Sequence, residues 1–159
     1  MNNVLHKTVF GSQLTKTYTL EEILNMLASK QLLNYGELTE QAISKKSKVA
    51  QCDKNTPGID LVSGVQIKYA QTNYNTQSNK GSLWGYISKK KHVETILAVV
   101  TETVTNKQYF FEFKHKDYKH INGNTFGIPF ELDGTPRRSN YWWLNEVPSF
   151  NCLCELAKC

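Results

Sequence analysis

Residues 57–70, PGIDLVSGVQIKYA, decide how this chain is expected to fold. Two runs of alternating apolar and polar residues flank Ser63-Gly64, and this arrangement predicts a β-hairpin. Alternation along a strand sends successive side chains to opposite faces. The apolar face of the hairpin then packs on the core and collects Ile59, Leu61, Val65, Ile67 and Tyr69.

The length of the turn sets which residues face each other across this hairpin. A two-residue loop would place Asp60 opposite Ile67 and away from Gln66. A three-residue loop places Gly64 where the common type I turn with a bulge needs a left-handed residue. It also sets Asp60 opposite Gln66, with Lys68 further along the same face. We therefore expect a carboxylate, an amide and an ammonium group to lie within a few ångströms of each other.

Helical periodicity dominates the chain before this hairpin. Residues 19–30, TLEEILNMLASK, have apolar residues at helical spacing, and Thr19 forms a capping box with Glu22. A second, Lys-rich helix is predicted over residues 37–50.

Strand signals dominate the chain after it. Residues 94–104 and 107–113 flank Asn106 and predict a second hairpin, in which the apolar run 96–100 is a central buried strand. The polar residues 71–81 are expected to form a surface loop.

Two further helices complete the prediction. Residues 82–88 are predicted to form one, and residues 148–158 a closing helix that starts at Pro148 and Ser149. Elements in this order predict an α/β fold, with a central mixed β-sheet flanked by helices.

Composition limits the class of protein. The 159 residues suit one domain, so residues 1–159 are predicted to form a single domain. Nineteen Lys and Arg against fourteen Asp and Glu give a net charge of +5, which is compatible with a polyanionic partner such as nucleic acid. No apolar run approaches the ~18 residues of a membrane span, and the N-terminus lacks a signal-peptide core. We expect a cytoplasmic protein with no membrane partner.

The four cysteines are expected to be free thiols in a reducing compartment. Cys152, Cys154 and Cys159 cluster near the C-terminus as Cys-x-Cys-x4-Cys, which lacks the paired Cys-x2-Cys modules of a zinc ribbon. A C-terminal helix carrying small apolar residues is the favoured interpretation. Whether these three cysteines bind zinc stays open.

The polar face of the first hairpin suits metal-assisted phosphodiester hydrolysis. Asp60 supplies a hard anionic oxygen for Mg²⁺, and Gln66 offers a neutral carbonyl oxygen to the same ion or its water shell. Lys68 can orient a water and offset charge on the phosphate. The alternative interpretation is an ordinary half-exposed hairpin with its polar residues outward.

The same segment resembles the core of the PD-(D/E)XK nuclease superfamily. That family places an acidic residue at the end of one strand and a Glu/Asp/Gln-x-Lys triplet on the next. Asp60 and Gln66-Ile67-Lys68 match these two elements, and the resemblance covers residues 36–70 directly. It implies a restriction-endonuclease-like core and catalytic roles for Asp60, Gln66 and Lys68.

Members of this family often carry a further Glu on the preceding helix, about four residues after a Gly. Gly36 and Glu40 fit that placement, so the resemblance implies that Glu40 is a second metal-binding carboxylate. Glu37 competes for this role, because it lies one helical turn earlier on nearly the same face.

The resemblance implies an endonuclease that cuts double-stranded DNA with Mg²⁺, similar to a type II restriction endonuclease. Cutting both strands with one active site per small domain implies a homodimer or a higher oligomer. A homing endonuclease and a Holliday-junction resolvase of the same fold are alternatives. A non-catalytic DNA-binding module is a third, favoured by Gln66 in place of an acid.

Basic residues outside the motif are candidates for DNA contacts. Lys89, Lys90 and Lys91 follow residues 82–88 and can bind phosphates, although such a run is also commonly just solvated. Arg137 and Arg138 are the only arginines, and Arg reads guanine edges with two hydrogen bonds.

Other residues are weaker candidates. Core packing is favoured over base stacking for Tyr141, Trp142 and Trp143. His115 and His120 lack the Asn-and-His arrangement of an HNH nuclease, and we expect them to be surface residues.

Overall fold

The structure, a computed structural model, describes residues 34–53, 56–74, 82–90, 92–120 and 123–159, together with four short strands nearer the N-terminus. The chain divides into two compact units, residues 1–34 and residues 35–159. The prediction of a single domain over residues 1–159 stays a prediction. All the residues proposed for catalysis belong to the second unit.

The described part of the first unit consists of two strand pairs. Strand β1 (Asn2–Val4) pairs with β4 (Thr17–Thr19), and β2 (Thr8–Val9) pairs with β3 (Ser12–Gln13), both antiparallel. Thr19 therefore ends a strand. The rest of the helix predicted over residues 19–30 lies outside the described residues.

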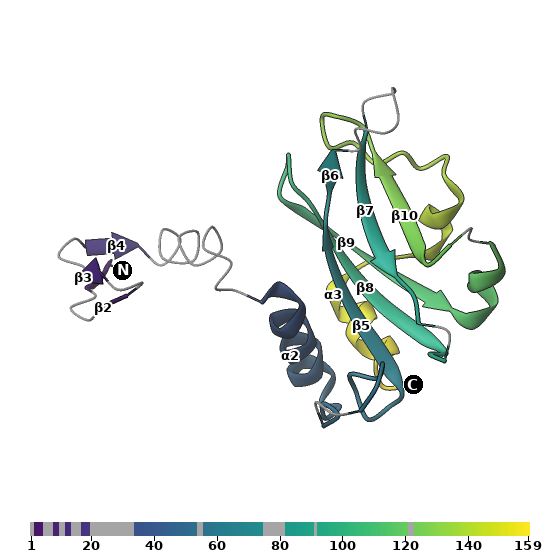
Figure 1. The fold of residues 1–159 in the computed structure, drawn as a ribbon, viewed down its shortest axis with the longest axis horizontal. Coiled ribbons are helices and arrows are strands. Elements are labelled where there is room, and N and C mark those ends of the chain that lie inside the picture. The colour runs from purple at the N-terminus through teal and green to yellow at the C-terminus, as the bar shows by residue number, and fades with distance from the viewer. Residues whose placement is uncertain are drawn as a thin grey trace. The chain divides into compact units, whose positions relative to one another are not determined.

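The second unit is built on a four-stranded sheet with the order β11-β9-β8-β5. Its members are β5 (Val65–Gln71), β8 (Thr95–Glu102), β9 (Lys107–Lys114) and β11 (Glu146–Val147). Strands β5 and β8 are parallel and the other pairs are antiparallel. This mixed sheet, with helices packed on it, confirms the predicted α/β class (Figure 1).

The second hairpin is confirmed. Strands β8 and β9 pair along their whole length, and Asn106 turns the chain between them with a φ of 58°. All of residues 96–100 are buried, as a central strand requires, because both faces of the sheet are covered.

A second, three-stranded sheet covers one face, with the order β10-β7-β6. Its strands are β6 (Asn73–Tyr74), β7 (Leu83–Ser88) and β10 (Thr125–Phe130). The helix predicted over residues 82–88 is therefore wrong, since burial alternates along β7 with the period of a strand. The loop predicted over residues 71–81 is wrong at Gln71, which ends β5, and at Asn73 and Tyr74, which pair with β7. Residues 75–81 of this loop lie outside the described part.

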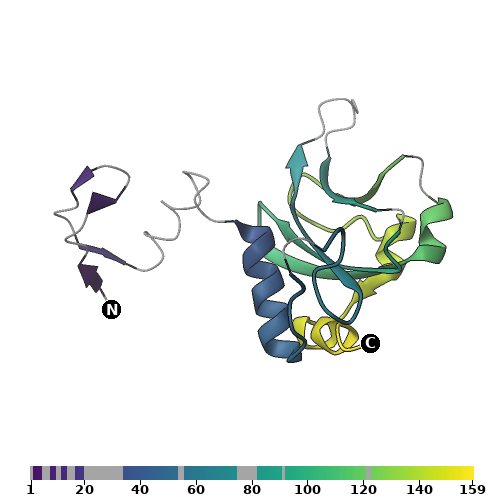
Figure 2. The same cartoon turned by 60° about the horizontal axis from the view of Figure 1, so that its bottom comes forward.

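Helices α2 (Tyr35–Ser47) and α3 (Phe150–Leu156) cover the other face of the main sheet (Figure 2). Helix α2 ends three residues before the predicted boundary, because Lys48 takes a left-handed φ of 61°. The closing helix α3 is confirmed, and the hydroxyl of Ser149 accepts a hydrogen bond from Cys152 N at 3.1 Å. Two 3₁₀ turns, η1 (His115–His120) and η2 (Tyr141–Asn145), lie between the strands. No helix in the described part has the length and apolar character that crossing a bilayer requires.

Side chains on the two faces of β5 enter two different cores. One core lies between the sheets and is rich in aromatic residues, and Ala70 of β5 packs against it. The other lies between the main sheet and the helices and contains Val65 and Ile67 of β5. Alternate residues of β5 therefore face different layers of the protein.

Substitution of Gly85 tests how closely the two sheets pack. A β-carbon at this position would lie 2.6 Å from Cγ1 of Val100, so Gly85→Ala should lower the free energy of unfolding by about 1–3 kcal/mol. Urea denaturation of Gly85→Ala, Val100→Ala and the double variant measures the coupling. The double variant should lose less stability than the sum of the two single variants, and additive losses would contradict this packing.

Candidate active site at the edge of the main sheet

The turn before β5 is tight. Gly64 N donates to Leu61 O at 2.9 Å, and Gly64 has a φ of 89°. Asp60 N and Leu61 N both donate to Val65 O, at 3.0 and 3.1 Å. The predicted left-handed turn at Gly64 is therefore confirmed.

The first arm of the predicted hairpin is not a regular strand. Leu61 makes only an isolated bridge to Gln51. This arm pairs instead with residues 50–52, since Cys52 N donates to Asp60 O at 2.8 Å and Val62 N donates to Ala50 O at 3.0 Å. The backbone of Asp60 lies opposite Val65, so the predicted register of Asp60 against Gln66 is wrong.

The side chain of Asp60 nevertheless reaches the predicted triplet. Its Oδ2 accepts a hydrogen bond from Ile67 N at 2.6 Å. Strand β5 is the edge strand of its sheet, so this N–H points away from β8. The carboxylate caps the free edge of β5 beside the residue that separates Gln66 from Lys68.

Gln66 and Lys68 lie on the same face of β5, as predicted. They are in register with Ile96 and Ala98, which belong to the core between the sheets. Lys68 is half-buried, but only 2% of Gln66 is exposed. The alternative of a half-exposed hairpin with polar residues outward is therefore wrong for Gln66, because the second sheet covers this face.

The amide oxygen of Gln66 is in an unusual state. Of the buried side-chain nitrogen and oxygen atoms in the described residues, Oε1 of Gln66 is the one that has no hydrogen-bond partner. An unsatisfied buried acceptor costs about 1–3 kcal/mol. A bound water, an ion or a donor group that reached this atom would satisfy it.

The donor set fits Mg²⁺ only as an incomplete site. Asp60 contributes a carboxylate and Gln66 a carbonyl oxygen, both hard ligands. The described residues contain no group of three His, Cys, Asp or Glu side chains that could hold a metal. Mg²⁺ commonly binds through one or two carboxylates and completes its shell with water and substrate phosphates, and this set of ligands has that incomplete form.

The helical carboxylate is placed less favourably. Glu40 and Glu37 are both half-buried on α2, and Glu37 Oε1 accepts from Gln41 Nε2 at 3.5 Å. Helix α2 packs on the face of the sheet opposite Gln66, through Ile43. The structure therefore does not bring this helix to the face of β5 that carries Gln66 and Lys68, and it favours neither glutamate as the second carboxylate.

The lysine run lies beside the loop that leads to Asp60. His92 Nε2 is 3.3 Å from Pro57 O, and a β-carbon on Gly58 would lie 3.4 Å from Cδ of Lys90. Lys90 is exposed, whereas Lys89 is half-buried with its Nζ 5.5 Å from the ring centroid of Tyr118.

Lys91 lies outside the described residues. The sequence does not show that the lysine run lies near Asp60, because this proximity depends on contacts of Lys90 and His92 with residues 57 and 58, which are distant in the chain.

Both arginines are engaged within the protein. Arg137 makes two hydrogen bonds to Glu131, at 2.7 and 2.8 Å, and these hold the pKa of Glu131 below its ordinary value. Arg138 pairs in the same way with Glu146 and lies 4.9 Å from the ring centroid of Trp143. Reading a guanine would require either guanidinium to leave its carboxylate.

Of the three aromatic residues predicted to pack in the core, two do so. Trp142 and Trp143 are buried in the aromatic core, which confirms the prediction for them, whereas Tyr141 is exposed and the prediction is wrong there. His115 and His120 are exposed, as expected.

The cysteines are free thiols. Cys154 is buried in the core beneath α3, and this burial raises the pKa of its thiol, whereas Cys152 and Cys159 are exposed. This arrangement confirms a helix that buries a small apolar residue.

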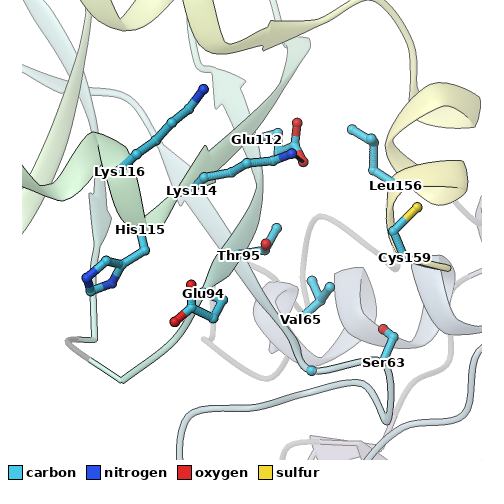
Figure 3. A pocket seen from close by; sticks show the side chains of 11 residues that line it. Ser63, Val65, Glu94, Thr95, Glu112, Lys114, His115, Lys116, Leu156 and Cys159 are labelled. Carbon is cyan, nitrogen blue, oxygen red and sulfur yellow. Dashed lines mark ion pairs between the residues drawn. The ribbon is translucent and has the colours of Figure 1, made fainter.

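A cavity of about 570 Å³ opens near the start of β5 (Figure 3). Val65 and Thr95 line it from the face opposite Gln66, and Lys114 Nζ lies 3.3 Å from Glu112 Oε1 at its wall. It contains none of the residues predicted for catalysis. Four separate segments form its wall, so no local sequence pattern marked it.

No protein-family model matches this chain, and no curated protein sequence matches it.

Gln66→Met tests the unpaired amide oxygen directly. Methionine has a similar length and no polar group. The free energy of unfolding of the variant should therefore be about 1–2 kcal/mol higher than that of the parent. Gln71→Met, on the exposed end of the same strand, is the matched control and should change little. Loss of stability in Gln66→Met, measured by urea denaturation, would show that the amide makes a structural hydrogen bond.

Proposed function

We propose that this protein is a cytoplasmic, Mg²⁺-dependent DNA endonuclease with a core like that of the PD-(D/E)XK restriction endonucleases. One observation carries the proposal. A buried amide oxygen without a partner, on Gln66, lies on the strand whose edge is capped by the carboxylate of Asp60. A catalytic role or a bound ion is one of the recognised explanations for such a costly group.

Each residue of the triplet has a role that its position supports. Asp60 and Gln66 would hold Mg²⁺, which when bound would polarise the phosphate and lower the pKa of a water. Lys68 lies two residues beyond Gln66 on the same face and is half-buried, so its ammonium can orient the attacking water. The same charge offsets the negative charge that develops on the phosphate.

The positive charge around the site supports a DNA substrate. Lys90 lies beside the loop before Asp60, where it can contact a phosphate next to the scissile bond. Cutting both strands of a duplex would require two copies of this site, so we propose a homodimer or a higher oligomer with two-fold symmetry.

A type II restriction endonuclease is the first choice of role. A homing endonuclease and a Holliday-junction resolvase use the same chemistry. The length of the DNA sequence that is recognised separates these roles.

A non-catalytic DNA-binding module is the second candidate. It is favoured by Gln66 in place of the acid that other members carry and by the lack, among the described residues, of a cluster of three metal-binding side chains. Such a module would bind DNA equally well with and without Mg²⁺.

Incubation of the purified chain with plasmid DNA tests the proposal. Cleavage should occur with Mg²⁺ and not with EDTA. Asp60→Asn keeps an acceptor for Ile67 N and removes the charge, so it should fold and cut at least about a hundredfold more slowly. Lys68→Met should slow cleavage to a similar extent, because it removes the group that orients the water.

Two matched controls separate catalysis from general charge effects. Asp133 also accepts a backbone hydrogen bond, from Thr135 N at 2.8 Å, so Asp133→Asn makes the same chemical change elsewhere. Lys107→Met removes an exposed lysine from β9 of the same sheet. Both controls should cut at the parental rate. DNA binding without any cleavage would support the non-catalytic module instead.

A further inference from the structure

Two aromatic side chains lie on the outward face of the second sheet. Strand β7 is the central strand of this sheet (Figure 1). Its residues Leu83, Gly85 and Ile87 are buried and face inward. Trp84 and Tyr86 alternate with them, so they lie on the other face. Trp84 is half-buried and 45% of Tyr86 is exposed.

The two rings are held parallel over a glycine. Their centroids lie 6.1 Å apart with an interplanar angle of 9°. Gly127 is the register partner of Tyr86 on β10, and a β-carbon there would lie 3.0 Å from Cε3 of Trp84 and 3.5 Å from Cε1 of Tyr86. The indole N–H of Trp84 donates to Ser82 Oγ at 2.8 Å, which fixes the larger ring. A β-carbon at position 127 would force the Trp84 ring to shift by a few tenths of an ångström.

The residues around Trp84 and Tyr86 indicate which kind of ligand would bind there. None of the described strands of this sheet, β6, β7 and β10, contains a charged residue. Lys89 and Lys90 follow β7 directly, and Lys90 lies at most about 14 Å along the chain from Tyr86. A planar, uncharged group attached to an anionic chain satisfies both features, and an unpaired nucleotide has this composition.

We propose that Trp84 and Tyr86 form a stacking surface for the bases of single-stranded DNA, with Lys90 contacting its phosphates. Bases stack on aromatic side chains with little sequence preference, and each stacked base contributes substantially to affinity. The inference rests on the proposed function because it takes DNA as the ligand. It adds to that proposal a second contact, in which the protein binds DNA that presents unpaired bases.

The test uses the full chain in EDTA, so that binding is measured without metal-dependent cleavage. The probe is a labelled single-stranded oligothymidylate of about 10 nucleotides, followed by fluorescence anisotropy. Trp84→Ala and Tyr86→Ala should each weaken binding about five- to hundredfold, and Trp84→Phe should bind nearly as well as the parent. Tyr141→Ala removes a similarly exposed tyrosine from η2 and should bind as the parent does.

Salt dependence separates stacking from phosphate contacts. Stacking releases no counterions, so Trp84→Ala should keep the parental slope of log affinity against log salt concentration, whereas Lys90→Ala should lower it. Tryptophan fluorescence of the parent protein provides a second test. Two of the three tryptophans, Trp142 and Trp143, are buried, so quenching of tryptophan fluorescence by unlabelled oligothymidylate should report Trp84.

The outcomes are distinguishable from those of the cleavage assay. Unchanged affinity in both Trp84→Ala and Tyr86→Ala, or binding of the parent without quenching, would overturn the inference. Binding of a neutral oligosaccharide in place of the oligonucleotide would overturn it too. Binding that depends on Trp84 in a chain that cuts no DNA would support the inference while removing the catalytic proposal.

Discussion

The parallel pairing of β5 with β8 is the constraint on which the rest of the second unit depends. Strand β8 is buried on both faces, and its register with β5 decides which side chains of β5 enter which core. Ile67 is aligned with Leu97 and faces the helices, whereas Gln66 is aligned with Ile96 and faces the second sheet. A shift of one residue would exchange these faces and put the amide and the ammonium under the helices.

The free edge of β5 is the second feature that defines the site. An edge strand exposes unpaired N–H groups, and Asp60 satisfies one of them through Ile67 N. The same contact holds a carboxylate next to Gln66 and Lys68. One aspartate thus has two tasks, since it protects the edge of the sheet and places a negative charge where the proposed chemistry needs it. This dual role explains why Asp60→Asn, which keeps the hydrogen bond, is the informative variant.

Sequence patterns predicted the parts of the fold that local interactions determine. The β8–β9 hairpin, the left-handed turn at Gly64 and the Ser149 cap of α3 follow from neighbouring residues, and the structure confirms them. Residues 82–88 were predicted to be a helix, and strand β7 was therefore missed. The alternating burial of these residues and the packing of Gly85 against Val100 belong to a strand and depend on the neighbouring sheet. The burial of Gln66 and the contact of Asp60 with Ile67 depend on tertiary packing, which periodicity alone does not show.

The measurement that tests the central claim most directly is a Mn²⁺ titration of the isotope-labelled protein, followed by amide NMR spectra. Mn²⁺ takes the same oxygen ligands as Mg²⁺ and broadens signals from nearby nuclei. The account predicts that amide signals of Asp60 and of Gln66 to Lys68 broaden first, and that Asp60→Asn abolishes this effect. Broadening that begins instead at Glu94 and Glu112 of the cavity would contradict a metal site at the edge of β5.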